Sequence, residues 1–172
     1  MKKNQKGFSL IELLIVVAII LIIAAIAIPN LLRARIAANE SSAVGSVRSI
    51  VTAEVSYSST WGQGFAAAIG NLGGAAGAAC TASAATACIL DPIITVAPNT
   101  KSGYVLSATG AGGAGTAANP FTSFEAAAVP VTVGTTGQRT FCSDESGVVR
   151  FDPAGGGDPG TDVACEKFVA LQ

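Results

Sequence analysis

Residues 8–30 of the chain read FSLIELLIVVAIILIIAAIAIPN. From Leu13 to Ile28 every residue is Ala, Val, Ile or Leu. The 21 residues from Phe8 to Ile28 would form a helix about 30 Å long, which matches the hydrocarbon thickness of a bilayer. Lysines precede the stretch, and the positive-inside rule keeps such an end cytoplasmic. The sequence therefore predicts a helix that can span a membrane, with the rest of the chain outside.

An acid interrupts this apolar stretch near its beginning. An ionised carboxylate in a spanning helix costs about 2.5–3.5 kcal/mol on insertion scales, so Glu12 indicates a function and requires a partner. An ordinary signal peptide cut near Ala25–Ala27 and a simple membrane anchor are the alternatives, and neither needs an acid there. If the chain is cut between Gly7 and Phe8, the new α-amino group is positive near neutral pH. We expect this amine, from the same or a neighbouring copy, to pair with Glu12.

The order Lys6-Gly7-Phe8-Ser9-Leu10-Ile11-Glu12, followed by the apolar run and Pro29, resembles the N-terminal signature of the type IV pilin superfamily. This superfamily includes pilins and the pseudopilins of type II secretion. The resemblance implies that a prepilin peptidase cuts after Gly7 and methylates Phe8. It also implies an assembly ATPase, an inner-membrane platform protein, and Glu12 as the assembly charge. Proline removes a helical hydrogen bond, and the resemblance implies that Pro29 kinks the helix or marks a stretch that melts on assembly.

The predicted fold is α+β. A long N-terminal helix, with a transmembrane half and an amphipathic half, packs against a small antiparallel sheet of three to four strands, and two disulfides are expected. The expected segments are a leader (1–7), the transmembrane and filament-core half of the helix (8–30), its amphipathic half (31–61), a Gly/Ala-rich variable loop region (62–103), and the sheet with a C-terminal disulfide loop (104–172).

The amphipathic half and the strands are read from periodicity. The expected apolar stripe is Ala37, Val44, Val47, Val51 and Val55, and the expected polar share is Arg33, Arg35, Glu40, Arg48 and Glu54. The strand candidates are Tyr104–Thr109, Phe121–Ala128, Gln138–Ser143 and Val148–Asp152. Pro130 is expected to make 129–133 an irregular extension or an edge.

Four cysteines behind an N-terminal export segment indicate two disulfides. A zinc site is the alternative, but the chain contains no His and no C-x-x-C pair. Of the three possible pairings, we favour the nearest neighbours, Cys80–Cys88 and Cys142–Cys165. Each pair then closes a Gly-rich loop that packing could not hold.

No catalytic constellation is visible, and we expect neither an enzyme nor a cofactor. Without His the familiar triads are absent, and no phosphate-binding loop occurs. The net charge of −1 gives no global signal for nucleic acid, so contact with DNA or a surface would need a local patch. Asp152, Asp158 and Asp162 form a weak calcium candidate in a Gly/Pro-rich loop, for which a solvated loop is the simpler interpretation.

The leading functional hypothesis is therefore a structural protein. It would wait in the bacterial inner membrane and then polymerise with copies of itself into an extracellular type IV pilus, serving adhesion, twitching motility or DNA uptake. The near alternative is a pseudopilin of a type II secretion system. An alternative of another class is a secreted binding domain with an ordinary signal peptide.

Overall fold

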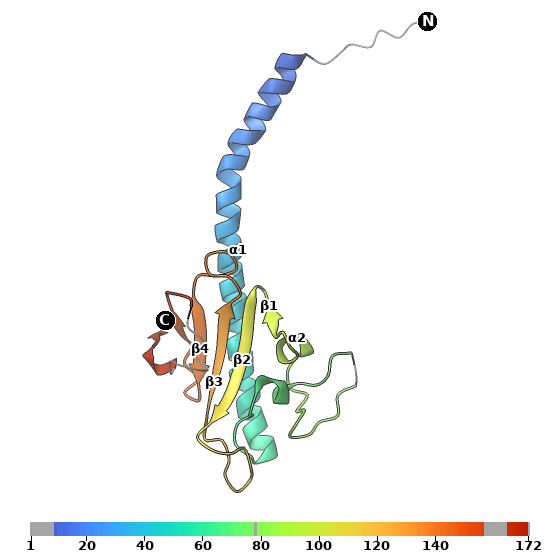
Figure 1. Cartoon of the computed structure of the whole chain (residues 1–172), viewed down its shortest axis with the longest axis vertical. Coiled ribbons are helices and arrows are strands. Elements are labelled where there is room, and N and C mark those ends of the chain that lie inside the picture. The colour runs from blue at the N-terminus through green and yellow to red at the C-terminus, as the bar shows by residue number, and fades with distance from the viewer. Residues whose placement is uncertain (1–8, 78, 157–164, 172) are drawn as a thin grey trace, which may run out of the picture. The chain divides into compact units, whose positions relative to one another are not determined.

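A computed structural model describes residues 9–77, 79–156 and 165–171. The chain divides into two compact units, residues 1–35 and residues 36–172, and we call the second unit the head. Helix α1 (Leu10–Trp61) contributes to both units (Figure 1). It continues through Pro29 without a break, so the expected kink or melting at this residue stays a prediction.

The head contains an antiparallel sheet in which each strand pairs with the next one along the chain (Figure 1). Its strands are β1 (Thr100–Lys101), β2 (Tyr104–Ala111), β3 (Ser123–Pro130), β4 (Thr140–Asp144), β5 (Arg150–Asp152) and β6 (Val169–Ala170). The described residues thus form six strands, and the prediction of three to four was too low. The cause lies in β1 and β6, because two residues are too few to show the alternation that identifies a strand.

Strand β3 also differs from its prediction. It continues through Val129 to Pro130, where Pro130 pairs with Tyr104 at the end of the β2–β3 ladder. Proline is tolerated there because Val131, the next residue, supplies the N–H that bonds the Gly103 carbonyl. The proline therefore ends a regular strand where an irregular extension was expected.

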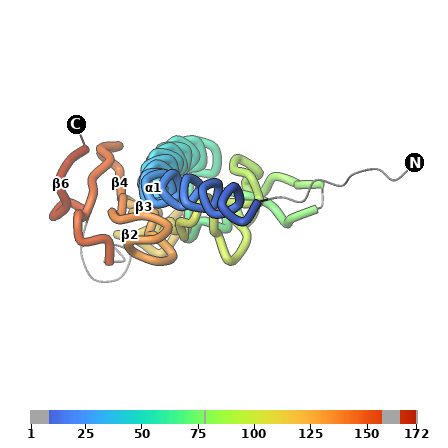
Figure 2. Tube along the Cα trace, turned by 90° about the horizontal axis from the view of Figure 1, so that it is seen from above, coloured from blue at the N-terminus to red at the C-terminus, as the bar shows by residue number. Residues whose placement is uncertain are grey.

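The main core of the head lies between the sheet and α1. Inward-facing Leu106 of β2, Phe124 of β3 and Phe141 of β4 pack with Val47 and Ile50 of the helix. Each of these side chains is at most 2% exposed. Figure 2 shows the sheet strands on one side of the helix. The head is therefore a two-layer arrangement whose core depends on the C-terminal half of α1.

The buried face of α1 differs from the predicted stripe. Val47 is buried, but Val55 is 55% exposed, and two acids assigned to the polar share, Glu40 and Glu54, are buried. The residues actually buried are Glu40, Ala43, Ser46, Val47, Ile50, Ala53, Glu54 and Tyr57. Their spacing of three and four residues is helical, and Val44 and Val51 of the predicted stripe also pack against the core although they are only partly buried. The predicted period is therefore right, and the stripe fails at its two ends, Ala37 and Val55, which are exposed. Counting both acids in the polar share concealed their place on the buried face.

The segment after α1 is held by backbone contacts and a disulfide. Gly64 has φ +75°, and its backbone approaches Phe121 so closely that a Cβ atom would collide with it. The N–H groups of Phe65 and Phe121 donate to the carbonyls of Phe121 and Gln63, each at 3.2 Å. Glycine is required here both for the left-handed conformation and for this close approach.

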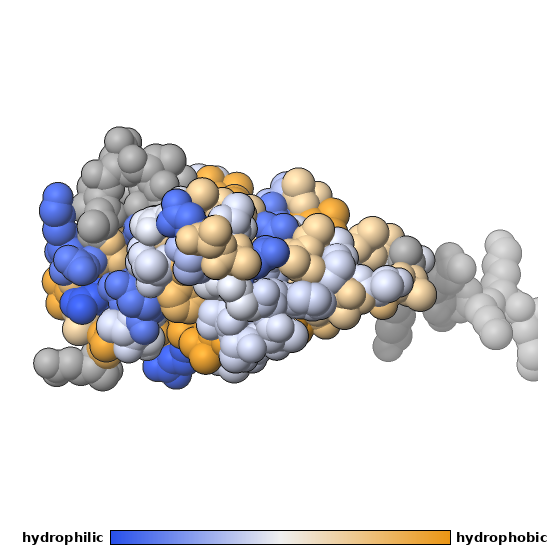
Figure 3. All heavy atoms as spheres, turned by 90° about the horizontal axis from the view of Figure 1, so that it is seen from below, coloured by the Kyte–Doolittle hydropathy of each residue, from blue (hydrophilic) through white to orange (hydrophobic). Residues whose placement is uncertain are grey.

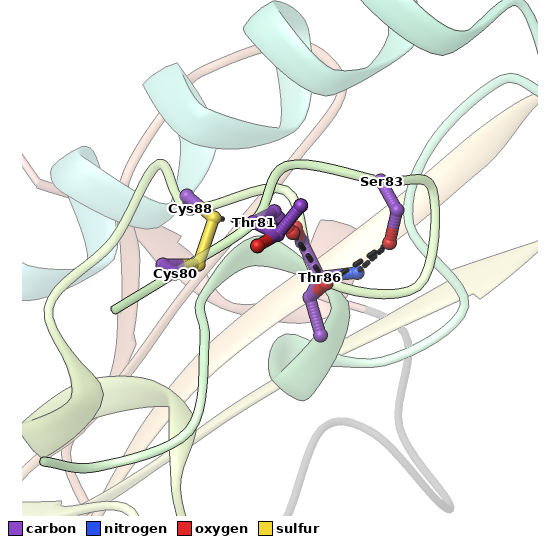
Figure 4. The surroundings of a disulfide bond; sticks show 5 residues. All are labelled: Cys80, Thr81, Ser83, Thr86 and Cys88. Atoms are coloured by element: carbon purple, nitrogen blue, oxygen red, sulfur yellow. Dashed lines mark hydrogen bonds between the residues drawn. A yellow bond between two sulfur atoms is a disulfide. The ribbon is translucent and has the colours of Figure 1, made fainter. Parts of the chain in front are cut away.

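Two short helices and the first disulfide organise residues 69–95. They are the 3-10 helix η1 (Ile69–Leu72) and α2 (Pro92–Thr95). Asp91 caps α2 by accepting the Ile93 N–H at 2.7 Å. Cys80 and Cys88 form a disulfide beside a tight turn in which Ser83 and Thr86 exchange hydrogen bonds (Figure 4). Residues 80–88 of the Gly/Ala-rich region therefore form an ordered loop.

The second disulfide joins Cys165 to the outer face of the sheet. Cys142 on β4 bonds Cys165 at the start of the 3-10 helix η2 (Cys165–Lys167). With Ala127 and the partly buried Phe168, these cysteines make a small second core. Ala127 is consequently buried although it points away from α1, which explains why Ala126–Ala128 are buried in succession.

Candidate functional site: the helix α1

The first turn of α1 places Glu12 against the backbone. The Ser9 N–H donates to Oε2 of Glu12 at 3.0 Å, and the Leu13 N–H donates to the Ser9 carbonyl at 3.2 Å. A Glu at the third helical position that bonds back to the residue before the helix is one half of a capping box. Its carboxylate also lies at the positive end of the helix dipole. Glu12 therefore has a partner within the uncut chain.

This contact was missed in the sequence, although its signal was present. The spacing Ser9-x-x-Glu12 is the capping-box pattern. The partner expected instead, the amine created by cleavage, belongs to Phe8. Gly7 and Phe8 both lie outside the described residues, so the pairing of that amine with Glu12 stays a prediction.

The apolar run of α1 is exposed in the unit formed by residues 1–35. Leu10 is 76% exposed and Ile22 is 63% exposed. By length and composition alone, α1 is the one helix in the described chain that is apolar enough to cross a membrane. Six side chains on one face border a shallow apolar hollow: Leu10, Leu13, Leu14, Val17, Ala18 and Leu21. This face requires a non-aqueous environment or a partner.

One face of the head is different in character (Figure 3). The face seen in Figure 3 mixes hydrophilic, intermediate and hydrophobic residues, with no continuous apolar run like that of residues 13–28. Such a mixed surface is typical of a domain in contact with water. This face of the head therefore differs from the apolar run of α1.

Glu40 fastens α1 to the loop that precedes β4. Its Oε1 accepts the backbone N–H groups of Gln138 and Arg139 at 3.0 and 3.1 Å. Its Oε2 accepts Nε and Nη2 of Arg139 at 3.0 and 2.7 Å. The Arg139 guanidinium also lies over the rings of Phe141 and Phe151, 5.3 and 5.2 Å from their centroids. The carboxylate thus accepts four hydrogen bonds and forms an ion pair whose cation stacks on two aromatic rings.

The electrostatics of Glu40 follow from these contacts. Burial raises the pKa of its carboxyl, but the hydrogen bonds from Arg139 and Gln138 and the charge of Arg139 lower it by more in total. The pKa of Glu40 therefore lies below its ordinary value. Glu40 is ionised in the folded head at neutral pH.

Glu54 has the opposite environment. It is 0% exposed and, within the described part of the chain, accepts only the Ala66 N–H, at 2.7 Å. Burial raises its pKa to about 7, and the Ala66 hydrogen bond offsets only part of this effect. Two acids on one helix, fourteen residues apart, thus have pKa values displaced in opposite directions.

The calcium candidate stays untested. Asp152 uses its carboxylate to accept the Ala154 N–H at 3.0 Å, whereas Asp158 and Asp162 lie outside the described residues. Glu125, Cys142 and Cys165 also converge within the described chain, but both sulfurs belong to the disulfide and cannot act as thiolate ligands. This cluster therefore does not form a metal centre.

A comparison with known families places a match at the N-terminal part of the chain. The family described as "Prokaryotic N-terminal methylation motif" matches residues 2–28. The chain is 67% identical over 39 residues to the type IV wide pilus major component PilA4 of Thermus thermophilus. The chain carries the N-terminal segment of the type IV pilin superfamily. The resemblance carried by Gly7, Phe8 and Glu12 is thereby confirmed at the level of the superfamily.

The similarity to these pilins covers a limited part of each protein. The match to PilA4 covers 23% of this chain and 30% of the relative. The type IV major pilin protein PilA of Myxococcus xanthus is 46% identical over 54 residues, which is 31% of this chain and 24% of that pilin. The chain thus matches less than a third of the length of either relative. The comparison with solved structures gives no significant match.

Proposed function

We propose that this chain is a structural subunit that polymerises into a type IV pilus filament on the bacterial surface, serving adhesion, twitching motility or DNA uptake. The observation that carries the proposal is the exposed apolar helix that begins at the Ser9–Glu12 turn, directly after the Gly7-Phe8 pair. A helix of this kind suits a bilayer before assembly and a bundle of identical helices after it.

The energetics of assembly differ from those of folding in water. Moving the helix from lipid into a filament core exchanges one apolar environment for another, so burial from water gives little driving force. Close packing of identical apolar faces and the pairing of charged groups must then favour the filament. An unpaired carboxylate in such a core is strongly disfavoured. Glu12 would therefore select the helix register in which its carboxylate meets the amine of Phe8 from a neighbouring copy.

The proposed pathway follows from the superfamily. A prepilin peptidase would remove residues 1–7 and methylate Phe8 while the chain is held in the inner membrane. An assembly ATPase and a platform protein would then drive the subunit into an extracellular filament. The head, with its mixed surface, would face solvent. A structural role of this kind requires no catalytic residue or cofactor in the chain.

The two alternatives make different predictions. A pseudopilin would assemble within a secretion apparatus, whereas both named relatives are pilus components, which supports the pilus. A secreted binding domain with an ordinary signal peptide would have a mature N-terminus near Ile28. The family match over residues 2–28 supports processing at the leader instead.

Mass spectrometry of the mature N-terminus, combined with electron microscopy of surface filaments, tests the proposal. We expect a mature chain that begins with N-methylated Phe8 and that is the principal subunit of sheared filaments. A mature chain that begins near Ile28 would eliminate the pilin pathway. A chain that begins at Phe8 but occurs only in the secretion apparatus would favour the pseudopilin.

A further inference from the structure

The head contains a carboxyl group that lacks the usual means of stabilising a buried charge. Glu54 is completely buried on α1, and its Oε2 accepts the Ala66 N–H at 2.7 Å. Its Oε1 is also buried and has no hydrogen-bond partner among the described residues. If this carboxyl group ionises while it is buried, the resulting carboxylate has no hydration shell and accepts one hydrogen bond instead. The neutral acid is therefore favoured in the folded head.

The elements that pack around Glu54 bring no cation to it, as far as the described residues extend. Tyr57, one turn further along α1, is the titratable group that faces it; burial raises the pKa of that phenol, and the charge of Glu54 adds to the effect. Residues 62–68 carry no ionisable side chain. The inward-facing residues of the neighbouring strands are Tyr104, Leu106 and Ala108 on β2 and Phe124, Ala126 and Ala128 on β3. Of these, Tyr104 alone titrates, and its charged neighbours are Glu40 and Arg139.

Residues 62–68, which we call the latch segment, connect the end of α1 to the sheet. The Phe65 ring packs against Phe124 of β3 in a tilted arrangement, with 4.7 Å between the centroids and 55° between the ring planes. The Gly110 N–H of β2 donates to the Ala67 carbonyl at 3.3 Å. Between these two contacts, the Ala66 N–H donates to the Glu54 carboxyl. The state of this carboxyl therefore acts directly on the segment that joins the two layers of the head.

We propose that Glu54 is a proton-dependent latch: as a neutral acid it holds residues 62–68 against α1, and ionisation allows this segment to open. In the closed head, burial raises the pKa of Glu54 to about 7, against an ordinary value of 4.5 when the segment opens and the carboxyl is hydrated. The closed form binds the proton more tightly than the open form. The free-energy preference for the closed form is therefore largest below pH 4.5. It declines as the pH rises to about 7 and is constant above that value.

The latch is tested by hydrogen exchange of the Ala66 amide in the full chain in detergent micelles, measured by NMR between about pH 4.5 and about pH 8. After correction for the intrinsic exchange rate, we expect the opening equilibrium of Ala66 to increase about tenfold per pH unit up to about pH 7 and then to level off. An Ala66 opening equilibrium that is independent of pH would overturn the proposal.

Two variants attribute the effect to one carboxyl. Glu54→Gln has the same shape and keeps an oxygen for the Ala66 N–H but does not titrate, so the pH dependence should disappear. Glu145→Gln removes an exposed carboxylate and should leave it unchanged. An unaltered pH slope in Glu54→Gln would refute the assignment. If Glu54→Gln does not fold, the carboxyl resonance of Glu54 in the unmodified chain decides: a midpoint near 7 supports the latch, and one near 4.5 rejects it. Neither result depends on whether the chain forms a pilus.

Discussion

The contact between Glu40 and Arg139 provides the most direct test of how α1 is held in the head. We consider Glu40→Ala, which removes the acceptor of four hydrogen bonds. Breaking a buried ion pair by deleting one partner costs about 3–5 kcal/mol. The Arg139 side chain is 37% exposed and can regain water, so we expect the lower end, about 3 kcal/mol of unfolding free energy. Glu40→Gln keeps one carbonyl oxygen for the backbone N–H groups and should cost about 1–2 kcal/mol.

Urea unfolding of the full chain in micelles, followed by the fluorescence of Trp61, measures these losses. Trp61 is the single tryptophan and packs against the head core, so its emission reports on this unit. Arg48→Gln, at an exposed position on the same helix, is the control and should change the free energy by less than about 0.5 kcal/mol. A loss below about 0.5 kcal/mol for Glu40→Ala would refute the assigned role of the ion pair.

The dependence on pH gives a second check of the same contact. Because the pKa of Glu40 is lowered on folding, its stabilising contribution is present above the ordinary value of 4.5 and is lost as pH falls through its lowered folded pKa. The difference between the unmodified chain and Glu40→Gln should therefore be constant at neutral pH and shrink in acid. A difference that grows in acid would contradict the direction of the pKa change.

Three further predictions concern assembly, the disulfide loop and the packing around Tyr104. Glu12→Ala and Glu12→Gln should both insert into membranes, but electron microscopy should show no filaments, because both variants lack the carboxylate charge. Normal filaments from Glu12→Gln would refute the charge pairing and would mean that Glu12 acts only as a helix cap. Replacing both Cys142 and Cys165 by serine opens a loop with a sequence separation of 23 and should lower the unfolding free energy by about 3 kcal/mol, so an unchanged urea midpoint would contradict it. Gly137→Ala places a methyl group against the buried Tyr104 ring and should cost about 1–3 kcal/mol in the same assay, whereas no loss would show that the loop yields freely.

The main elements of the fold could be predicted because each is encoded by a sequence pattern that extends over many consecutive residues. The apolar run, the spacing of Gly7, Phe8 and Glu12, and the alternation in β2 each extend over enough residues to be distinctive. The two-residue strands β1 and β6 could not be predicted, since their pairing depends on neighbours supplied by the rest of the sheet. Because these two short strands were missed, the predicted number of strands in the sheet was too low.

The buried acids show a different limit. Helical periodicity treats every Glu as polar, yet Glu40 is buried because Arg139, 99 residues away, provides its counter-charge. Glu54 is buried because the chain turns back after Trp61 and presents the Ala66 N–H. Neither partner lies in the helical segment over which the periodicity was assessed. The Ser9–Glu12 contact, in contrast, lies within four residues and was available from spacing alone.

The order of the strands has a consequence for how the head folds. Since each strand pairs with its successor, the sheet can grow by closing short loops one after another, and such local contacts are associated with fast folding. Glu40 and Arg139 close a far longer loop, whose entropic cost is greater. We therefore expect the helix to dock onto a sheet that has already formed. During synthesis from the amino terminus, the head can then fold completely only after the last third of the chain has emerged.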